Sequence, residues 1–374
     1  MGHDLDRYHR QMLLPGFGSE GQKKLLSATV LVVGCGALGT VVANTLARAG
    51  VGHLIIVDRD YIEISNLQRQ VLFDEHDVEK GIPKAEAARL KLFRINSQVK
   101  VTSIVDDLNH TNIETLVTPP LSNTASTSHI DAIVDGVDNF ETRFLVNDCA
   151  VKHGIPYVYG GAVGTVGMTY AILPHSAATA SSPPWEQAGK ATPCLRCIFE
   201  QMPQPGMSPT CDTVGVLNAV ASIVASMEAA EVLKILTGNW HAINPMMQHL
   251  DVWENSFHQF HVEGAYDVSR CICCKQRRFE FLEGRFASGT TTLCGRNAIQ
   301  LTQRCLGSRL DFDQIVQRLR PHGTVKVNRF MLCAHITDHG KPYELTIFTD
   351  GRAIVKGTKE PNVAKSIYAK YIGT

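Results

Sequence analysis

The chain has 374 residues, of which 44% are hydrophobic, so it is long enough for one large domain and a smaller one. Lysine plus arginine and aspartate plus glutamate both number 36, and this balance favours neither nucleic acid nor a membrane surface as a partner. The most apolar stretches, residues 30–42 and 214–230, are interrupted by glycine or polar residues and are expected to be core elements, not membrane spans. No secretory signal is visible, and an odd number of cysteines, eleven, favours a cytoplasmic protein with reduced thiols and one metal site.

The first part of the chain reads as alternating helices and strands. Residues 4–27 are expected to be helical, and the apolar run at 29–33 is typical of a strand buried on both faces. A glycine-rich turn, a helix over 37–49 and a strand over 53–57 follow, which predicts a parallel sheet with a right-handed crossover. Further strands are expected at 99–105, 130–134 and 156–159, and helices at 83–95, 109–117 and 140–153. The predicted fold is therefore α/β, with a Rossmann-like, doubly wound and mainly parallel sheet.

The second part of the chain is less regular. Residues 174–193 are expected to form an exposed loop, and residues 213–236 a long apolar helix closed by Gly238. Composition changes after Cys274, so we expect one domain over residues 1–280 and a small α+β domain over 281–374. The smaller domain should contain a helix at 312–319, followed by three or four strands that include 343–348 and 353–356 around the turn at Asp350 and Gly351, and a closing helix at 361–371.

The glycine-rich turn is the first functional motif. Gly34 permits the tight turn, Gly36 allows backbone to approach phosphate, and Gly39 allows the helix to pack on the strand. The turn follows a predicted strand and opens a predicted helix, which is the context that a nucleotide site requires. Asp58 ends the second strand, where its carboxylate is suited to a pair of ribose hydroxyls. These features alone leave an NAD-dependent oxidoreductase open as an alternative.

Cationic residues near the same sheet edge point to a different chemistry. Arg69 lies in the segment that contains Asn66, and Lys84 stands at a predicted helix start. Positive groups of this kind are needed when a carboxylate attacks a nucleoside triphosphate, because both reactants are anionic. Asp138 follows a buried strand, where a lone carboxylate can hold Mg²⁺. Each residue alone would be read as a solvated charge, but together they predict a site.

Two cysteine pairs, Cys194-x-x-Cys197 and Cys271-x-x-Cys274, predict a second kind of site. Each pair presents two thiolates on one turn, and two such turns complete the tetrahedron that Zn²⁺ prefers. Cys273 also lies in the second pair's segment, but Cys274 has the better spacing. With four thiolates and no open position, the zinc is expected to be structural and to clamp distant segments.

These motifs, taken in chain order, resemble the ThiF/MoeB family, the bacterial relatives of ubiquitin-activating enzymes. The resemblance covers about residues 5–275 and rests on the run from Arg7 to Gln11, the glycine turn, the segment from Asn66 to Gln70, Pro83-Lys84, Asp138-Asn139 and the two cysteine pairs. Residues 293–297 (LCGRN) resemble the extended ThiF-like branch, which slightly favours a thiamin-type pathway over a molybdopterin-type one.

The resemblance implies an adenylyltransferase. A ubiquitin-fold sulfur-carrier protein ending in Gly-Gly would offer its C-terminal carboxylate to the α-phosphate of Mg-ATP, giving an acyl-adenylate and pyrophosphate. Asp58 would hold the ribose, Asn66, Arg69 and Lys84 would contact phosphates, and Asp138 would coordinate Mg²⁺. Arg10 would reach the ATP of the other subunit of a symmetric homodimer. The 281–374 region could recognise the carrier, contribute to dimerisation or cap the sheet.

Cys211 is a further candidate, because it precedes the predicted apolar helix and a helix N-terminus favours thiolate. In the resembling family this position can form a thioester or persulfide-linked bond with the carrier, although adenylation does not require it and Asp212 opposes thiolate formation. A third alternative, beside the adenylyltransferase and the oxidoreductase, is a non-catalytic scaffold. The intact set of Arg69, Lys84 and Asp138 disfavours it.

Overall fold

The computed structural model describes residues 5–118, 129–176, 181–202, 211–286, 290–293, 298–301, 310–338, 340–349 and 351–372. It divides the chain into two compact units, Met1–Phe286 and Ala287–Thr374. Residues 294–297 and Asp350, which belong to the LCGRN segment and to the expected turn, lie outside the described residues. Among the described residues, no helix combines the length and the apolar character needed to cross a membrane.

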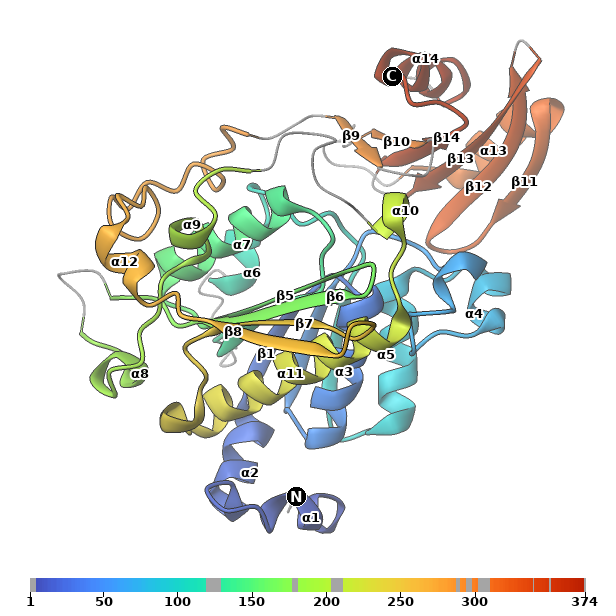
Figure 1. Ribbon diagram of the computed structural model, residues 1–374. Coiled ribbons are helices and arrows are strands. Elements are labelled where there is room, and N and C mark those ends of the chain that lie inside the picture. Colours follow the sequence, from blue (N-terminus) through green and yellow to red (C-terminus); the bar gives the residue numbers. More distant parts are fainter. Residues whose placement is uncertain are drawn as a thin grey trace. The chain divides into compact units, whose positions relative to one another are not determined.

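The first unit is built on an eight-stranded sheet with the order β3-β2-β1-β4-β5-β6-β7-β8 (Figure 1). Pairing is parallel from β3 to β5 and antiparallel from β5 to β8. The strands are β1 (Thr29–Val33), β2 (His53–Val57), β3 (Lys100–Ile104), β4 (Ala132–Asp135), β5 (Tyr157–Val163), β6 (Val166–Ile172), β7 (Met247–Asp251) and β8 (Ser256–Phe260). The expected α/β sheet with mainly parallel pairing is confirmed, and its strand order runs outward in both directions from β1.

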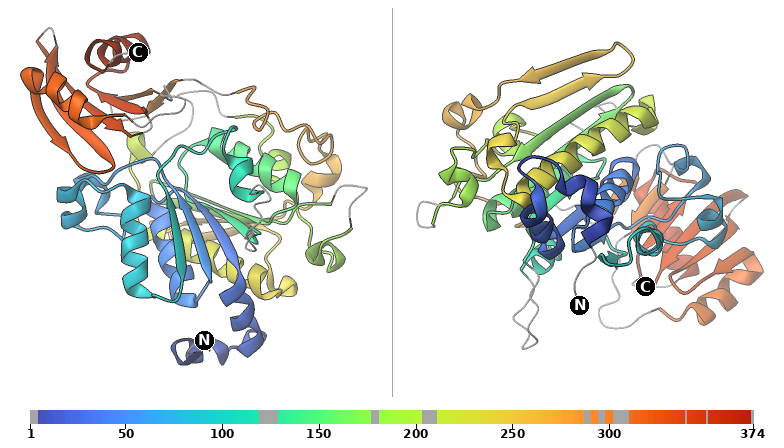
Figure 2. Two further views of the ribbon diagram at one scale, coloured as in Figure 1. Left: turned by 180° about the vertical axis from the view of Figure 1, so that it is seen from behind. Right: turned by 90° about the horizontal axis from the view of Figure 1, so that it is seen from below.

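Helices cover both faces of this sheet (Figures 1 and 2). The side chains of β1 alternate, with Val30 and Val32 in one hydrophobic core and Leu31 and Val33 in the other. The first core includes α3 (Ala37–Ala49), α5 (Lys84–Ile95) and α11 (Asn218–Thr237), and the second includes α6 (Ile113–Val117) and α7 (Phe140–His153). With both faces covered, the carboxyl ends of the parallel strands form the edge at which ligands bind in such sheets.

The remaining helices of this unit are short. They are η1 (Leu5–Tyr8), α1 (His9–Met12), α2 (Gly18–Ser27), η2 (Ile64–Asn66), α4 (Glu75–Lys80), α8 (Pro184–Gln187), α9 (Leu195–Ile198), α10 (Cys211–Val214), η3 (Trp240–Ala242) and α12 (Gly264–Val268). The short α8 lies within the segment that was expected to be only a loop.

Three helices differ from the sequence-based expectation. The helix over 4–27 is broken between α1 and α2, where Gly16 has a φ of 77°. The helix over 213–236 is divided into α10 and α11, because Gly215 takes a φ of 80° between them. Only Ile113–Val117 of the 109–117 segment is helical, since Asn109 and Asn112 use their side chains to bond the loop backbone.

The second unit contains a six-stranded antiparallel sheet with the order β11-β12-β13-β14-β10-β9. Its helices at 312–319 and 361–371 occur where they were expected, and the four strands β11 to β14 follow the first helix, in agreement with the expected three or four. The strands β9 and β10, which precede that helix, were not expected. Its elements are β9 (Thr290–Leu293), β10 (Ala298–Leu301), α13 (Phe312–Leu319), η4 (Arg320–His322), β11 (Gly323–Val327), β12 (Met331–Asp338), β13 (Lys341–Phe348), β14 (Ala353–Lys356) and α14 (Pro361–Tyr371). Ile299, Leu345 and Ile367 belong to its separate hydrophobic core.

A histidine in the parallel sheet makes the stability of the chain depend on pH. His53 of β2 is half-buried with its Nε2 2.9 Å from Thr102 Oγ1, and burial together with Lys100 lowers its pKa to about 4. The unfolded side chain, with a pKa of about 6.5, binds more protons than the folded one in the window between the two values. The free energy of unfolding should therefore fall by about 1–2 kcal/mol as pH drops through that window, after allowance for solvent exposure. Urea denaturation at several pH values measures this effect. The free energy of unfolding of His53→Gln should depend less on pH between about 4 and 6.5 than that of the wild type, and an equal dependence would contradict this assignment.

Candidate functional site

The turn between β1 and α3 contains three glycines, and the surroundings of each differ in whether they would admit a larger side chain. Gly34 has a φ of 86°, and a Cβ there would lie 2.6 Å from the carbonyl oxygen of Gly136. A Cβ on Gly39 would lie 2.0 Å from the carbonyl oxygen of Gly34, so α3 packs directly against the turn. At Gly36, by contrast, the nearest atoms to such a Cβ would be 3.8 Å away. Packing therefore requires glycine at two positions, while a methyl group on Gly36, beside the N-terminus of α3, would meet its neighbours at ordinary contact distance.

This difference predicts that alanine at Gly39 affects stability, whereas alanine at Gly36 affects ligand binding. Gly39→Ala should lower the free energy of unfolding by about 1–3 kcal/mol, because the new methyl group meets backbone. Gly36→Ala should change the stability by less than about 1 kcal/mol, because its neighbours are at ordinary contact distance, but should weaken binding of a phosphate ligand that approaches the backbone at Gly36. Thermal unfolding and nucleotide titration of both variants test this, and equal loss of stability in the two would contradict it.

Asp58 joins the end of β2 to the glycine turn. Its Oδ2 accepts a hydrogen bond from the Cys35 backbone N–H at 2.6 Å, and its Oδ1 accepts one from the Asp60 N–H at 2.7 Å. Burial raises the pKa of Asp58, while the charge of Lys84 opposes that shift. The carboxylate is thus fixed in place beside the turn and lies within the electrostatic reach of a lysine.

Lys84 is the first residue of α5 and is buried, with 4% of its side chain exposed. Its Nζ donates to Asp60 Oδ2 at 3.0 Å. The structure therefore brings Lys84 to the end of β2, next to Asp58, and adds Asp60 as a partner that sequence reasoning missed. The alternation of acidic residues after a buried strand was the available signal for Asp60.

Two side-chain amides near the turn carry buried polar atoms that lack a hydrogen-bond partner among the described residues. They are Nδ2 of Asn66 and Oε1 of Gln70, and both residues are almost completely buried. Gln70 Nε2 lies 3.9 Å from the position that a Cβ of Gly36 would occupy. Because buried amides are normally satisfied, these two atoms are candidates to bind a polar ligand. Arg69 is partly exposed in the same segment, and its guanidinium donates to the Ser65 carbonyl at 2.9 Å.

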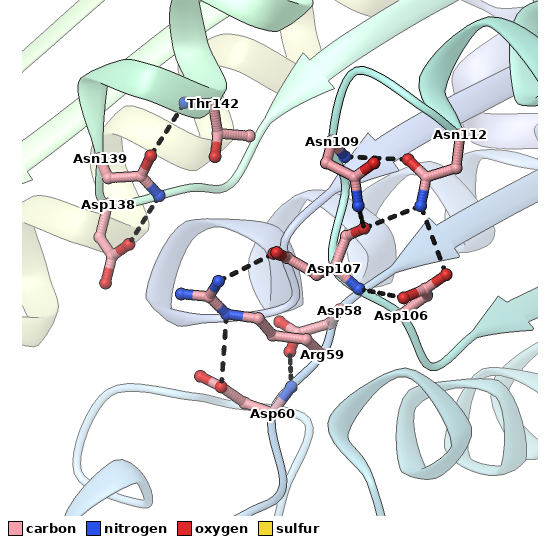
Figure 3. Close-up of polar contacts among 10 residues, drawn as sticks. All are labelled: Asp58, Arg59, Asp60, Asp106, Asp107, Asn109, Asn112, Asp138, Asn139 and Thr142. Carbon is pink, nitrogen blue, oxygen red and sulfur yellow. Dashed lines mark hydrogen bonds and ion pairs between the residues drawn. The ribbon is translucent and has the colours of Figure 1, made fainter. Parts of the chain in front are cut away.

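Asp138 lies in the loop that follows β4, just before α7 (Figure 3). Its side chain is exposed, and its Oδ1 accepts from Asn139 Nδ2 at 3.5 Å. Asn139 in turn caps α7, since its Oδ1 accepts from the Thr142 N–H at 2.9 Å. The strand ends at Asp135 and not at the expected Val134, and Asp138 lies in a loop that the Asn139 side chain ties to the N-terminus of α7.

Arg59 is a site residue that sequence reasoning missed. Its Nη1 donates to Asp107 Oδ1 at 2.8 Å, and its Nε lies 3.9 Å from Asp60 Oδ1. Burial opposes the charge of Arg59, but Asp107, Asp60 and Asp138 together raise its pKa. In Figure 3 the guanidinium contacts Asp107 and Asp60, so this arginine joins the loop after β2 to the loop after β3, and Asp138 in the loop after β4 acts on it through its charge.

The loop that carries Asp138 rests on a buried ion pair. Arg143 of α7 donates from Nε to Asp135 Oδ2 at 3.1 Å, and from Nη2 to the carbonyls of Val137 and Gly160, both at 2.9 Å. Asp135 also accepts from the Tyr157 hydroxyl at 2.7 Å. This network fixes the path of the chain immediately before Asp138.

Of the remaining predicted residues, Arg10 lies away from this edge, whereas Cys211 lies at the carboxyl end of β5, a strand that is parallel to β4. Arg10 is exposed on α1, and its neighbour Gln11 donates to Ala49 at the C-terminal end of α3, the end opposite the glycine turn. Cys211 begins the short α10 and not the long α11, and its Sγ donates to the Ala162 carbonyl at 3.3 Å. The dipole of the long helix therefore does not act on this thiol.

The four cysteines of the two pairs form a cluster whose sulfur atoms all lie within 4.8 Å of one another. The individual S···S distances are 3.8 Å for Cys194–Cys197, 3.6 Å for Cys194–Cys271 and 3.3 Å for Cys197–Cys274. A tetrahedral zinc with bonds of 2.3 Å separates its sulfurs by about 3.8 Å, so the donor set fits that ion.

Asn147 of α7 ties the two cysteine segments together. Its Oδ1 accepts from the Leu195 N–H at 2.8 Å, and its Nδ2 donates to Cys273 Sγ at 3.4 Å. Cys273 is thus buried beside the cluster but is directed toward Asn147, whereas Cys274 completes the set of four.

Comparison with known proteins gives concordant results. The sequence pattern of the ThiF family matches residues 8–272. A sulfur carrier protein ThiS adenylyltransferase from Bacillus subtilis (strain 168) is 38% identical over 368 residues, which cover 98% of this chain and 99% of that protein. A sulfur carrier protein adenylyltransferase from Thermus thermophilus is 40% identical over 274 residues, covering 72% of this chain and 91% of that protein. A crystal structure of E. coli MccB with ATP shares the fold, with a TM-score of 0.55, 24% identity and coverage of 73% of this chain and 75% of that one.

Proposed function

The chain belongs to the ThiF family, as its motifs predicted, and we propose that it is an adenylyltransferase that activates a sulfur-carrier protein with ATP. The carrier has a ubiquitin-like fold, ends in Gly-Gly and presents its C-terminal carboxylate to the α-phosphate. A carboxylate oxygen bonds to the α-phosphorus while the bond to the pyrophosphate leaving group breaks, so the products are a carrier acyl-adenylate and pyrophosphate. The names of the two relatives, which both refer to a sulfur carrier protein, support this substrate, and the pathway that we propose is of the thiamin or molybdopterin type.

The observation that carries this proposal is the pair of unsatisfied amide atoms on Asn66 and Gln70, because the Gln70 side-chain amide lies beside Gly36. A buried donor without a partner suits a phosphate oxygen, and a buried acceptor suits a ribose hydroxyl. Lys84 stands next to Asp58 at the same edge, so an anionic ligand there meets a positive charge. An oxidoreductase shares the glycine turn and Asp58, but it has no need of this lysine, and we do not propose it.

Each site residue has a defined role in this reaction. Asp58 holds the ribose, and the turn of Gly34, Gly36 and Gly39 with the start of α3 receives the phosphates. Asn66, Arg69 and Lys84 contact phosphate oxygens and offset the repulsion between the carboxylate and the triphosphate. Asp138 provides the carboxylate for Mg²⁺, an ion that offsets phosphate charge when bound.

Arg10 acts on the nucleotide of a second subunit in a symmetric homodimer. Its place near the opposite end of α3 from the glycine turn supports this role, because a helix of 13 residues is about 20 Å long. Cys211 is not needed for adenylation, so a Cys211→Ala variant that keeps pyrophosphate exchange but loses sulfur transfer would place it in a covalent carrier intermediate. The domain over residues 281–374 then recognises the carrier, contributes to dimerisation or caps the sheet.

The test of the proposed function is carrier-dependent exchange of labelled pyrophosphate into ATP. Carriers of the thiamin and molybdopterin types, each ending in Gly-Gly, are assayed beside matched carriers that lack the final glycine. We expect exchange with at least one intact carrier and none with its shortened form. Absence of exchange with every intact carrier, in the presence of Mg²⁺, would refute the proposal.

We also propose that the cysteine cluster holds a structural Zn²⁺ through Cys194, Cys197, Cys271 and Cys274. Cys274→Ser should lose the metal and lower the midpoint of thermal unfolding, because zinc binding contributes directly to folding. Cys273→Ser is the matched control, since it removes the adjacent thiol but leaves the set of four intact. Metal analysis of the purified variants decides the matter, and equal zinc content in both would overturn the assignment.

A further inference from the structure

We propose that Arg59 determines how the base of the nucleotide is held, by stacking the plane of its guanidinium against the purine ring. The inference rests on the proposed function, because it takes the ligand to be ATP with its ribose at Asp58.

The topology places the base near Arg59. The phosphates lie at the turn after β1, the ribose lies at the end of β2, and β3 is the next strand in the sheet order. The base is attached to the ribose on the side away from the 5′-phosphate, so it extends beyond Asp58 toward the end of β3. Arg59 and the loop between β3 and α6 occupy this region (Figure 3).

The loop after β3 is built to hold Arg59 in one position. Asp107, which accepts from Arg59 at 2.8 Å, is itself fixed by its neighbours. Its backbone N–H donates to Asp106 Oδ1 at 2.7 Å, and its carbonyl accepts from Asn112 Nδ2 at 2.8 Å and from Asn109 Nδ2 at 2.9 Å. An anchor that is fixed by three side chains reduces the entropy that Arg59 would lose on binding a ligand.

The contacts of Arg59 involve the edges of its guanidinium group, so a flat face of the group is the part that can meet a ligand. Nη1 donates to Asp107, and Nε is directed toward Asp60, so two edges of the guanidinium are turned to carboxylates. The side chain remains 21% exposed, which keeps part of it accessible. A planar cation of this kind attracts the π-face of an aromatic ring, and a lysine at the same position would offer no such plane.

The experiment compares the binding of ATP with that of ribose 5′-triphosphate, which has the same sugar phosphate but no base. Both are titrated calorimetrically, with Mg²⁺, into the full chain and into Arg59→Leu. The wild-type preference for ATP over ribose triphosphate should fall by about three- to thirtyfold in the variant, the range of a cation–π contact. Affinity for ribose triphosphate itself should stay within about twofold of the wild type.

Arg59→Lys provides a second arm that keeps the charge and its partner Asp107. Its preference for ATP should lie below that of the wild type, because an ammonium has no plane to stack on the base, and this arm alone tests the proposal if Arg59→Leu does not fold. An equal loss of affinity for ATP and for ribose 5′-triphosphate would show that Arg59 acts through its charge or through the structure. That result would overturn this inference but not the proposed function. Failure of the wild type to bind either ligand would instead refute the proposed function and the inference with it.

Discussion

Asp138→Asn is expected to lower the rate of carrier-dependent pyrophosphate exchange by about a hundredfold or more. The substitution keeps the shape of the side chain but removes the charge that, in our proposal, holds Mg²⁺ beside the phosphates. Asp138 is exposed and its Oδ1 has only a 3.5 Å contact with Asn139, so stability should change little. Initial rates of exchange over a range of Mg²⁺ concentrations measure the effect. The Mg²⁺ concentration that gives half of the maximal rate should be higher for the variant than for the wild type.

A matched control stands at the other end of the same strand. Asp131 precedes β4, and its Oδ2 accepts from the Thr29 N–H at 2.8 Å, at the amino edge of the sheet. Asp131→Asn makes the same chemical change away from the proposed site and should keep exchange within about threefold of the wild type. Similar rates for the two variants would remove Asp138 from the catalytic group.

The parallel half of the sheet could be predicted because its signals are local. The apolar runs of β1 and β2 flank a glycine turn, and the three together define a strand–helix–strand unit. The strands β6, β7 and β8 were not predicted. In β8 only Phe257 and Phe260 are large apolar residues, and both are exposed, so the strand depends on pairing with β7 and not on a buried pattern of its own.

Part of the candidate site could be predicted, because the carboxyl ends of parallel strands meet at one edge of a sheet. Asp58 and Lys84 were expected there because one follows a buried strand and the other opens a helix, and the structure brings them together. The pairing of Lys84 with Asp60 and of Arg59 with Asp107 joins segments far apart in the chain. No local pattern reports such contacts, since they depend on how the loops after separate strands approach each other in the folded protein.

The largest stability effect is expected at the ion pair beneath the loop of Asp138. Arg143→Met should lower the free energy of unfolding by about 3–5 kcal/mol, because it leaves the buried carboxylate of Asp135 without its counter-charge. The variant also loses the hydrogen bonds to the carbonyls of Val137 and Gly160. Urea denaturation at neutral pH measures the loss, with circular dichroism reporting the fraction folded.

A double variant separates the lost counter-charge from the lost packing. Arg143→Met combined with Asp135→Asn removes both charges, and a buried pair without either charge is often nearly as stable as the original. The double variant should therefore be more stable than Arg143→Met alone, with a coupling free energy of about 1–3 kcal/mol. If the two substitutions prove additive, the pair is not a coupled unit. The loop before Asp138 would then depend on the Val137 and Gly160 hydrogen bonds alone, and exchange activity would follow Arg143 and not Asp135.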